Sequence, residues 1–131
     1  MPNSSDLLLD THVLVWLLED SERLGPTARR LITGGGSVRY SAASVWELVL
    51  KQRRGRFVIG PGLVEGIQMA GVQELPVTAV HSLHAASVEL PHNDPFDALI
   101  IAQAQAESLT LVTADRLVLS SGACALVDAR R

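Results

Sequence analysis

The sequence predicts an α/β fold, with a central, mainly parallel sheet of about five strands flanked by helices on both faces. Short apolar runs alternate along the chain with longer segments of helical character, which is the pattern of βαβ units. A length of 131 residues and a hydrophobic content of 47% suit one packed core. With no internal repeat and no linker-like tract, residues 1–131 are expected to form a single domain.

The strands are expected where apolar runs are short and are bounded by turn or polar residues. The first run, Leu7 to Leu9, ends in Asp10 and has the character of a buried strand. The second alternates between polar and apolar residues, and the third is interrupted late by Pro76. The five expected strands cover residues 7–9, 37–41, 72–77, 109–113 and 123–127.

Helices are expected between these strands, where capping residues mark their starts. One helix begins just after Asp10, and Pro26 stands in the first turn of the next. Ser44, followed three residues later by Glu47, has the spacing of a capping box, and Asp94 precedes the most strongly helical segment. The expected helices cover about residues 11–18, 26–32, 44–54, 63–70, 80–90 and 96–107.

Composition narrows the class of protein. The uncharged runs are broken well before the ~18 apolar residues that a membrane-spanning helix needs. The first residues lack a basic stretch ahead of an apolar one, so no signal peptide is expected. The single cysteine, Cys124, suits a reducing cytoplasm, and its apolar neighbours indicate that it fills the core. We therefore expect a cytoplasmic protein with no membrane partner.

The net charge of −3 argues against a nucleic-acid partner, but such a footprint depends on local rather than total charge. Four cations fall within residues 51–56. They are either a binding patch or a solvated helix end, where the helix dipole favours positive charge. The candidate contacts to a polyanion are Lys51, Arg53, Arg54, Arg56 and Arg116.

Four acids occupy equivalent places in the predicted fold. Asp10 closes the first strand, and Asp115 lies two residues past the end of the fourth. Glu47 and Asp97 lie in the first turns of helices that follow strands or loops at the same edge. Because ligands gather outside the carboxyl ends of parallel strands, the four carboxylates are expected to converge. A hard divalent cation, Mg²⁺ or Mn²⁺, would relieve their repulsion.

Each acid also has a structural interpretation. Asp10 caps a helix, Glu47 is the capping-box partner of Ser44, Asp97 complements a helix dipole, and Asp115 is a turn residue. The histidines lack metal-ligand spacing apart from the isolated pair His81 and His84, which we interpret as surface or packing residues.

The motifs that contain the four acids resemble those of a known family, the PIN domain, and more closely those of the VapC toxins of bacterial toxin–antitoxin pairs. The resemblance extends from Leu7 to Val127. It is carried by Leu-Leu-Leu-Asp10-Thr-His, Ser41-Ala-Ala-Ser-Val-Trp-Glu47-Leu, Asp94-Pro-Phe-Asp97-Ala-Leu-Ile-Ile-Ala and Leu-Val-Thr113-Ala-Asp115-Arg.

The resemblance implies a Mg²⁺- or Mn²⁺-dependent endoribonuclease whose metal-binding, catalytic acids are Asp10, Glu47, Asp97 and Asp115. It assigns Asp94 as an accessory acid at the mouth of the site. Many relatives carry Arg where this chain has Ala98, a departure that concerns surface contacts rather than metal binding. The resemblance further implies an RNA substrate, a cognate antitoxin protein and a homodimer.

The remaining assignments complete this hypothesis. Thr11, Ser41 and Thr113 are expected to hydrogen-bond the carboxylates or a ligand water. Two alternatives stay open: a non-catalytic PIN-like binding module, and a phosphatase with Asp10 as nucleophile. The phosphatase is disfavoured because such enzymes generally have a second acid two residues after the nucleophile, and this chain has His12 at that position.

Overall fold

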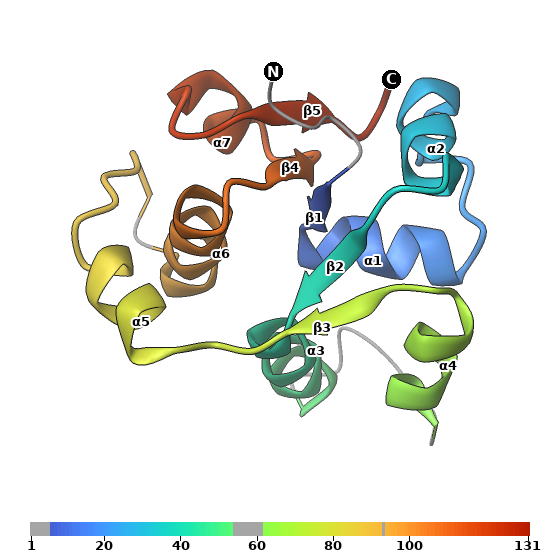
Figure 1. Cartoon of the computed structure of the whole chain (residues 1–131), viewed down its shortest axis with the longest axis horizontal. Helices are drawn as coiled ribbons and strands as arrows, with labels where there is room; N and C mark the ends of the chain where they lie inside the picture. The colour runs from blue at the N-terminus through green and yellow to red at the C-terminus, as the bar shows by residue number, and fades with distance from the viewer. Residues whose placement is uncertain (1–5, 54–61, 93) are drawn as a thin grey trace.

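The computed structural model describes residues 6–53, 62–92 and 94–131. In these ranges, five strands form one sheet in the order β3-β2-β1-β4-β5, and every neighbouring pair is parallel. The sheet is flanked by helices, so the predicted fold class is confirmed (Figure 1). The strands are β1 (Leu7–Leu9), β2 (Val38–Ser41), β3 (Gln73–Leu75), β4 (Thr110–Thr113) and β5 (Leu126–Asp128).

Helices connect the strands along most of the chain. The N-terminal half contains α1 (Thr11–Leu18), α2 (Pro26–Thr33), α3 (Ala42–Arg53) and α4 (Leu63–Met69). The C-terminal half contains α5 (Ala79–Ala85), α6 (Pro95–Ala106) and α7 (Arg116–Ser121). Among the described residues, no helix has both the length and the apolar character needed to cross a membrane.

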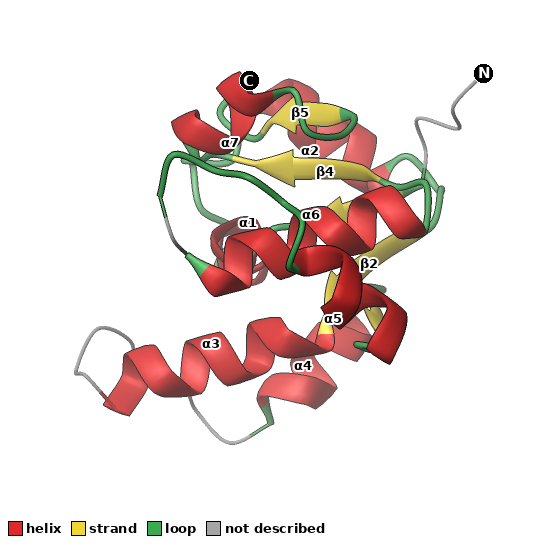
Figure 2. Cartoon of the chain, turned by 90° about the vertical axis from the view of Figure 1, so that its left-hand side faces the viewer, coloured by secondary structure: helices red, strands yellow, loops and turns green. Residues whose placement is uncertain are grey.

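The central strand β1 contributes to two hydrophobic cores, one on each face of the sheet. Leu7 and Leu9 pack with residues of α1, α2 and α4, whereas Leu8 packs with residues of α6 and α7. This division follows from the period of two along a strand, which sends successive side chains to opposite faces. Figure 2 shows α6 in front of the sheet and α1 behind it.

Strand order places a ligand-binding edge between β1 and β4. From β1 the chain runs outward to β2 and then β3, and it returns to β4 on the other side of β1. Such a reversal opens a crevice at the carboxyl ends of the two strands. Leu9 pairs with Val112 across this junction, so the residues that follow each strand, including Asp10, emerge side by side.

Several predicted boundaries were wrong. The helix α7 was not predicted; it has only six residues and ends in two serines. The helix predicted over 80–90 ends at Ala85, and β3 is shorter than expected. The fifth strand lies at 126–128 rather than 123–127. The predicted end of the third helix, at residue 54, lies outside the described residues.

The third helix begins two residues earlier than predicted, at Ala42. Ser44 therefore lies inside the helix and is fully buried, so it does not cap it. The capping-box interpretation of Glu47 is consequently wrong. The Oγ of Ser41 instead accepts a hydrogen bond from the backbone N–H of Ala43 at 3.1 Å, at the start of this helix.

Candidate active site

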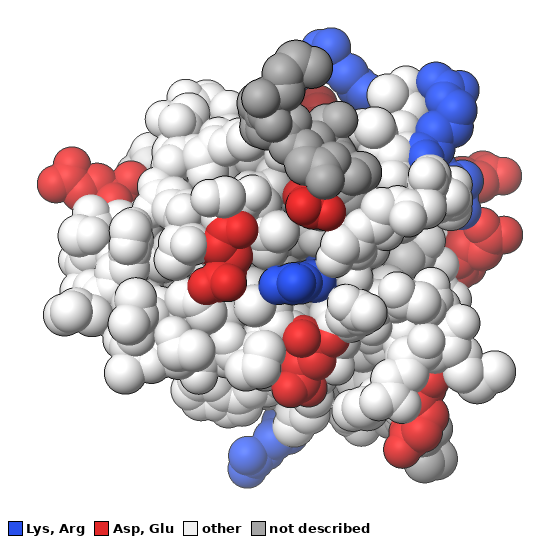
Figure 3. Space-filling model, viewed as in Figure 1, with Lys and Arg blue, Asp and Glu red and all other residues white. Residues whose placement is uncertain are grey.

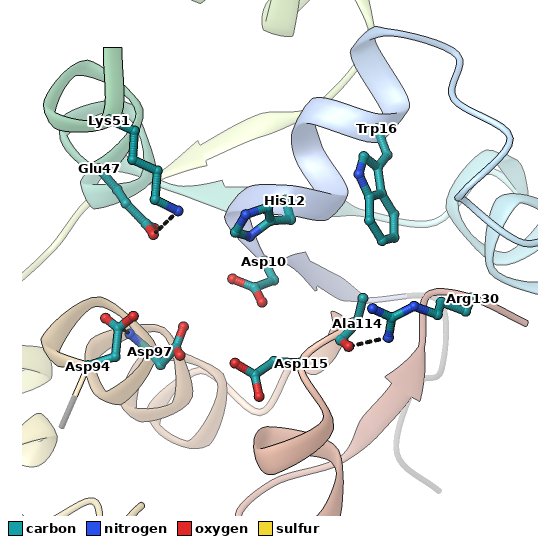
Figure 4. Close-up of a pocket in the computed structure, with 10 residues that line it drawn as sticks. All are labelled: Asp10, His12, Trp16, Glu47, Lys51, Asp94, Asp97, Ala114, Asp115 and Arg130. Carbon is teal, nitrogen blue, oxygen red and sulfur yellow. Dashed lines mark hydrogen bonds and ion pairs between the residues drawn. The ribbon is translucent and has the colours of Figure 1, made fainter. Parts of the chain in front are cut away.

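A cavity of about 250 Å³ opens at the carboxyl edge of β1 and β4 (Figure 4). Five carboxylates from four different parts of the chain line it, and its other lining residues are mostly aromatic or cationic. The five are the four predicted site acids and the accessory acid: Asp10, Glu47, Asp94, Asp97 and Asp115. The sequence-based expectation that these acids converge therefore agrees with their placement.

Asp10 lies at the base of the cavity, directly after β1. Its Oδ1 accepts a hydrogen bond from the backbone N–H of Thr11 at 2.8 Å, so it caps α1. Its Oδ2 accepts from the Thr113 hydroxyl at 2.7 Å, as predicted for that threonine. Burial raises the pKa of Asp10 despite these two hydrogen bonds. The carboxylate is fixed in position, and its negative charge is costly without a cation nearby.

Glu47 is only 6% exposed and projects from α3. Its Oε1 accepts a hydrogen bond from the Thr11 hydroxyl at 2.6 Å, and its Oε2 lies 2.9 Å from Nζ of Lys51 one turn later. The Thr11 oxygen also lies 2.9 Å from Oγ of Ser44. Since a hydroxyl has one hydrogen, Thr11 donates to the carboxylate and accepts from Ser44. This buried network holds Glu47 toward the cavity.

Asp97 stands in the first turn of α6, which is capped by the neighbouring Asp94. The Oδ1 of Asp94 accepts hydrogen bonds from the backbone N–H groups of Phe96 and Asp97, at 2.9 and 3.3 Å. Burial, followed by repulsion from four nearby carboxylates, raises the pKa of Asp97 from its usual 3.8 to about 8. Those carboxylates belong to Asp10, Asp94, Asp115 and Glu47.

The two carboxylate oxygens of Asp115 have different partners: one caps a helix, and the other faces the cavity. Its Oδ1 accepts hydrogen bonds from the backbone N–H groups of Leu117 and Val118, at 2.9 and 3.2 Å, and thereby caps α7. Its Oδ2 faces His92, whose Nε2 lies 3.6 Å away. The same nitrogen lies 3.4 Å from Oδ2 of Asp97. One ligand atom from each of these three residues lies within 4.8 Å of the others.

Four residues at the site were missed by the sequence analysis as functional candidates: His12, Trp16, His92 and Arg130. Arg130 follows β5, donates to the carbonyl of Ala114 and holds its guanidinium 6.0 Å from the Trp16 ring centre. Its position past the carboxyl end of a parallel strand was the available signal. His92 lies two residues before the cap Asp94, but in a loop that no periodic pattern describes.

Within the described residues, the predicted cations Lys51, Arg53 and Arg116 are not gathered into one patch. Lys51 lies in the cavity beside Glu47, whereas Arg53 and Arg116 are exposed at the end of α3 and the start of α7. Arg54 and Arg56 lie outside the described residues. On the face seen in Figure 3, acidic and basic residues are scattered among uncharged ones. A positive footprint would therefore be assembled from separate elements around the cavity.

The other titratable candidates have structural explanations. His81 is buried, accepts a hydrogen bond from the Thr78 backbone N–H and lies 3.0 Å from Glu107, which makes it a packing residue as expected. His84 is exposed and contacts Gln105. Cys124 is partly buried against the second core, and burial raises the pKa of its thiol to about 11, so it is a poor nucleophile.

The residues present suit a hard divalent cation. Several carboxylates share a recess, and the raised pKa of Asp97 reflects a concentration of negative charge that a cation would neutralise. Oxygen ligands of this kind are typical of magnesium and manganese sites. A parallel α/β sheet with converging acids at its switch point thus defines a class of proteins suited to metal-assisted phosphate chemistry.

Comparison with known proteins assigns the family. The PIN domain model matches residues 7–119, and the chain belongs to the PIN domain family. It is 30% identical over 113 residues to Ribonuclease VapC22 of Mycobacterium tuberculosis, a match that covers 84% of this chain and 87% of the relative. The resemblance found in the sequence motifs is confirmed.

Solved structures agree on the fold. A toxin–antitoxin complex from Klebsiella pneumoniae matches with a TM-score of 0.66 at 16% identity, covering 94% of this chain and 97% of the matched chain. VapBC2 from Rickettsia felis, bound to a promoter DNA fragment, matches with a TM-score of 0.64 at 16% identity, covering 92% and 96%.

Proposed function

We propose that this chain is a VapC-type endoribonuclease that cleaves RNA phosphodiester bonds with the help of a divalent cation. The observation that carries the proposal is the gathering of Asp10, Glu47, Asp97 and Asp115 in one recess, where the pKa of Asp97 reaches about 8. Such a concentration of carboxylates is costly to the fold, and a bound cation would offset that cost. The similarity to a ribonuclease supports RNA as the substrate class.

In this proposal, the four acids hold Mg²⁺ or Mn²⁺. The bound ion would activate a water and polarise the scissile phosphate. The chain itself orients the carboxylates: Thr113 holds Asp10, and Thr11 holds Glu47. Asp94 also lines the cavity, fixes the first turn of α6 and adds negative charge.

RNA phosphates would be neutralised around the cavity rather than by one basic surface. Lys51 reaches the recess from α3, and Arg130 reaches it from the opposite wall beside Trp16. Arg53, Arg54, Arg56 and Arg116 are the further candidates for contacts along the strand. Because such contacts release counterions, binding of RNA should weaken steeply with added salt.

We also propose a protein partner. Similar solved structures include a toxin–antitoxin complex and VapBC2, which supports a cognate antitoxin that neutralises this chain. A homodimer and a cytoplasmic location complete the proposal, and the lone Cys124 suits a reducing compartment. Co-purification with a small protein from a neighbouring gene would support the toxin role, and the absence of such a partner would count against it.

The decisive experiment compares wild-type protein with Asp97→Asn on a labelled RNA, with Mn²⁺ or with EDTA. We expect cleavage that EDTA abolishes and that the substitution lowers by more than about 100-fold, because loss of a ligand should exceed the loss typical of its outer hydrogen-bond partners. Asp20→Asn is the matched control, since Asp20 is an exposed acid paired with Arg29.

Full cleavage by folded Asp97→Asn in EDTA would overturn the metal-nuclease proposal. RNA binding without cleavage in any metal would favour the non-catalytic binding module. Hydrolysis of a phosphate monoester, with RNA left intact, would favour the phosphatase.

A further inference from the structure

His92 lies where a ligand of the proposed metal centre would stand. It belongs to the loop between α5 and α6, and its Nε2 faces the carboxylates of Asp97 and Asp115 at 3.4 and 3.6 Å. Two atoms bound at about 2.1 Å to one ion are themselves roughly 3 to 4 Å apart. The spacing of the nitrogen and the two oxygens is therefore that of ligands to a common ion.

No hydrogen bond to a described residue accounts for the position of the imidazole. Both ring nitrogens are buried, and neither has a hydrogen-bond partner among the described residues. The contacts to Asp97 and Asp115 fall within ion-pair distance but lack hydrogen-bond geometry. Buried imidazole nitrogens are normally satisfied, and a nitrogen directed at two carboxylates without bonding to either is suited to share an ion with them.

We infer that His92 is a nitrogen ligand of the metal centre and that it gives the site a preference for Mn²⁺ over Mg²⁺. This inference rests on the proposed function, because it assumes that the acids bind a divalent ion. The chemical reason for the preference is that an imidazole nitrogen is a softer ligand than a carboxylate oxygen. Mg²⁺ strongly prefers oxygen, whereas imidazole binds the transition metals more tightly along the series that begins with Mn²⁺.

The simpler alternative is that His92 is only an ion-pair partner of the two acids in the metal-free protein. In that case a metal would displace the ring, and removing it would leave the affinity for metal unchanged or raise it. The two alternatives therefore predict different effects of the same substitution: loss of a ligand weakens Mn²⁺ binding, and loss of an ion-pair partner does not.

The test measures metal binding in RNA-free protein. Isothermal titration with MnCl₂ and with MgCl₂ gives the dissociation constants of wild type and His92→Ala. We expect the substitution to weaken Mn²⁺ binding by about tenfold or more while changing Mg²⁺ binding much less. His84→Ala is the matched control, because His84 is an exposed histidine that contacts Gln105 away from the cavity.

A spectroscopic measurement identifies the nitrogen directly. Pulsed electron paramagnetic resonance of the Mn²⁺-loaded wild-type protein, prepared with ¹⁵N-labelled histidine, should reveal a coupled imidazole nitrogen. The coupling should disappear in His92→Ala and persist in His12→Ala, which removes the other histidine at the cavity. Because the wild-type spectrum alone is informative, the test does not depend on every variant folding.

The inference is overturned if Mn²⁺ bound to the wild type shows no histidine coupling, or if the coupling or Mn²⁺ affinity is unchanged in His92→Ala. Failure of the proposed function looks different. Asp97→Asn should lose Mn²⁺ binding in either case, and if it binds Mn²⁺ like wild type, the acidic metal centre itself is wrong.

Discussion

Individual carboxylates at this site both cap a helix and line the cavity. In Asp115, one oxygen caps α7 and the other faces His92 and Asp97 across the recess. Asp10 likewise caps α1 while lining the cavity. Interpretations as helix cap and as site residue are therefore compatible, because a carboxylate has two oxygens and capping needs one.

The raised pKa of Asp97 predicts an unusual pH dependence of stability in metal-free protein. A carboxyl group with a pKa of 3.8 unfolded and about 8 folded binds its proton more tightly in the folded chain. Its stabilising contribution is complete below the unfolded value and is lost as the pH rises toward the folded one. We expect the melting temperature in EDTA to fall between about pH 5 and 8, and Asp10 acts in the same direction.

Asp97→Asn should remove much of this pH dependence and raise the melting temperature in EDTA at high pH, since it deletes one charge from the cluster. Added Mg²⁺ or Mn²⁺ should raise the melting temperature of the wild type but not of the variant. A melting temperature that rises with pH in EDTA would contradict the assigned direction of the pKa shift.

The hydrogen bonds of the Thr113 hydroxyl should affect how tightly the site binds a metal ion. It donates to Asp10 Oδ2 and accepts from the backbone N–H of Asp115 at 3.1 Å. Thr113→Val should cost about 1 to 3 kcal/mol in urea unfolding and weaken metal binding by roughly 10- to 100-fold.

Thr33→Val serves as the control, because the Thr33 hydroxyl is exposed and donates only locally, to a carbonyl of its own helix. The free energy of unfolding and the metal affinity should both change little in Thr33→Val. Equal effects of the two substitutions would contradict a special role for Thr113.

At the scale of the element, the short helix α7 depends on the residue that caps it. Asp115→Asn keeps an oxygen that accepts from the first backbone N–H groups, whereas Asp115→Ala removes it. Loss of a cap typically costs about 1 kcal/mol. We expect Asp115→Ala to be destabilised by roughly that amount relative to Asp115→Asn, measured by urea unfolding in EDTA.

Both substitutions should reduce metal-dependent cleavage strongly, since each removes the charge of the oxygen that faces the cavity. If Asp115→Asn retained full cleavage, Asp115 would be a structural cap without a role at the metal.

The two halves of the chain are connected because the C-terminal residues are held against the start of α2. The backbone N–H of Gly25 donates to the carbonyl of Ala129, and that of Thr27 donates to the carbonyl of Arg131. A β-carbon on Gly25 would lie 2.3 Å from a backbone carbon of Arg131 and 2.5 Å from one of Arg130. A glycine is therefore needed for this close backbone approach.

Gly25→Ala should push the tail away, displace Arg130 from the cavity wall and cost about 1 to 3 kcal/mol of unfolding free energy. Gly66→Ala is a matched control in α4, where a β-carbon meets nothing within 4 Å and a helical alanine should stabilise by about 0.5 to 1 kcal/mol. If Gly25→Ala and Gly66→Ala were equally stable, the close backbone contact between Gly25 and the C-terminal residues would be contradicted.

Much of the fold was predictable because it follows from local patterns. The three buried leucines of β1 and the capped helix that begins at Asp94 are defined by residues close together in the chain. The helix α7 was not predictable, since six residues carry too little periodicity and its cap resembles an ordinary turn. The single-domain organisation over residues 1–131 stays a prediction, as do the roles of the individual site residues.

Alternating strands and helices were enough to predict the fold class, and the motifs around the acids carried the resemblance to the family. The acids were expected to meet because strand ends and helix starts share one edge of a parallel sheet. The residues that surround those acids became known from the three-dimensional structure. It placed Thr11 against Glu47, Arg130 on the cavity wall and His92 between Asp97 and Asp115. These contacts join segments far apart in the chain or lie in irregular loops, where side-chain direction depends on packing rather than on any local repeat.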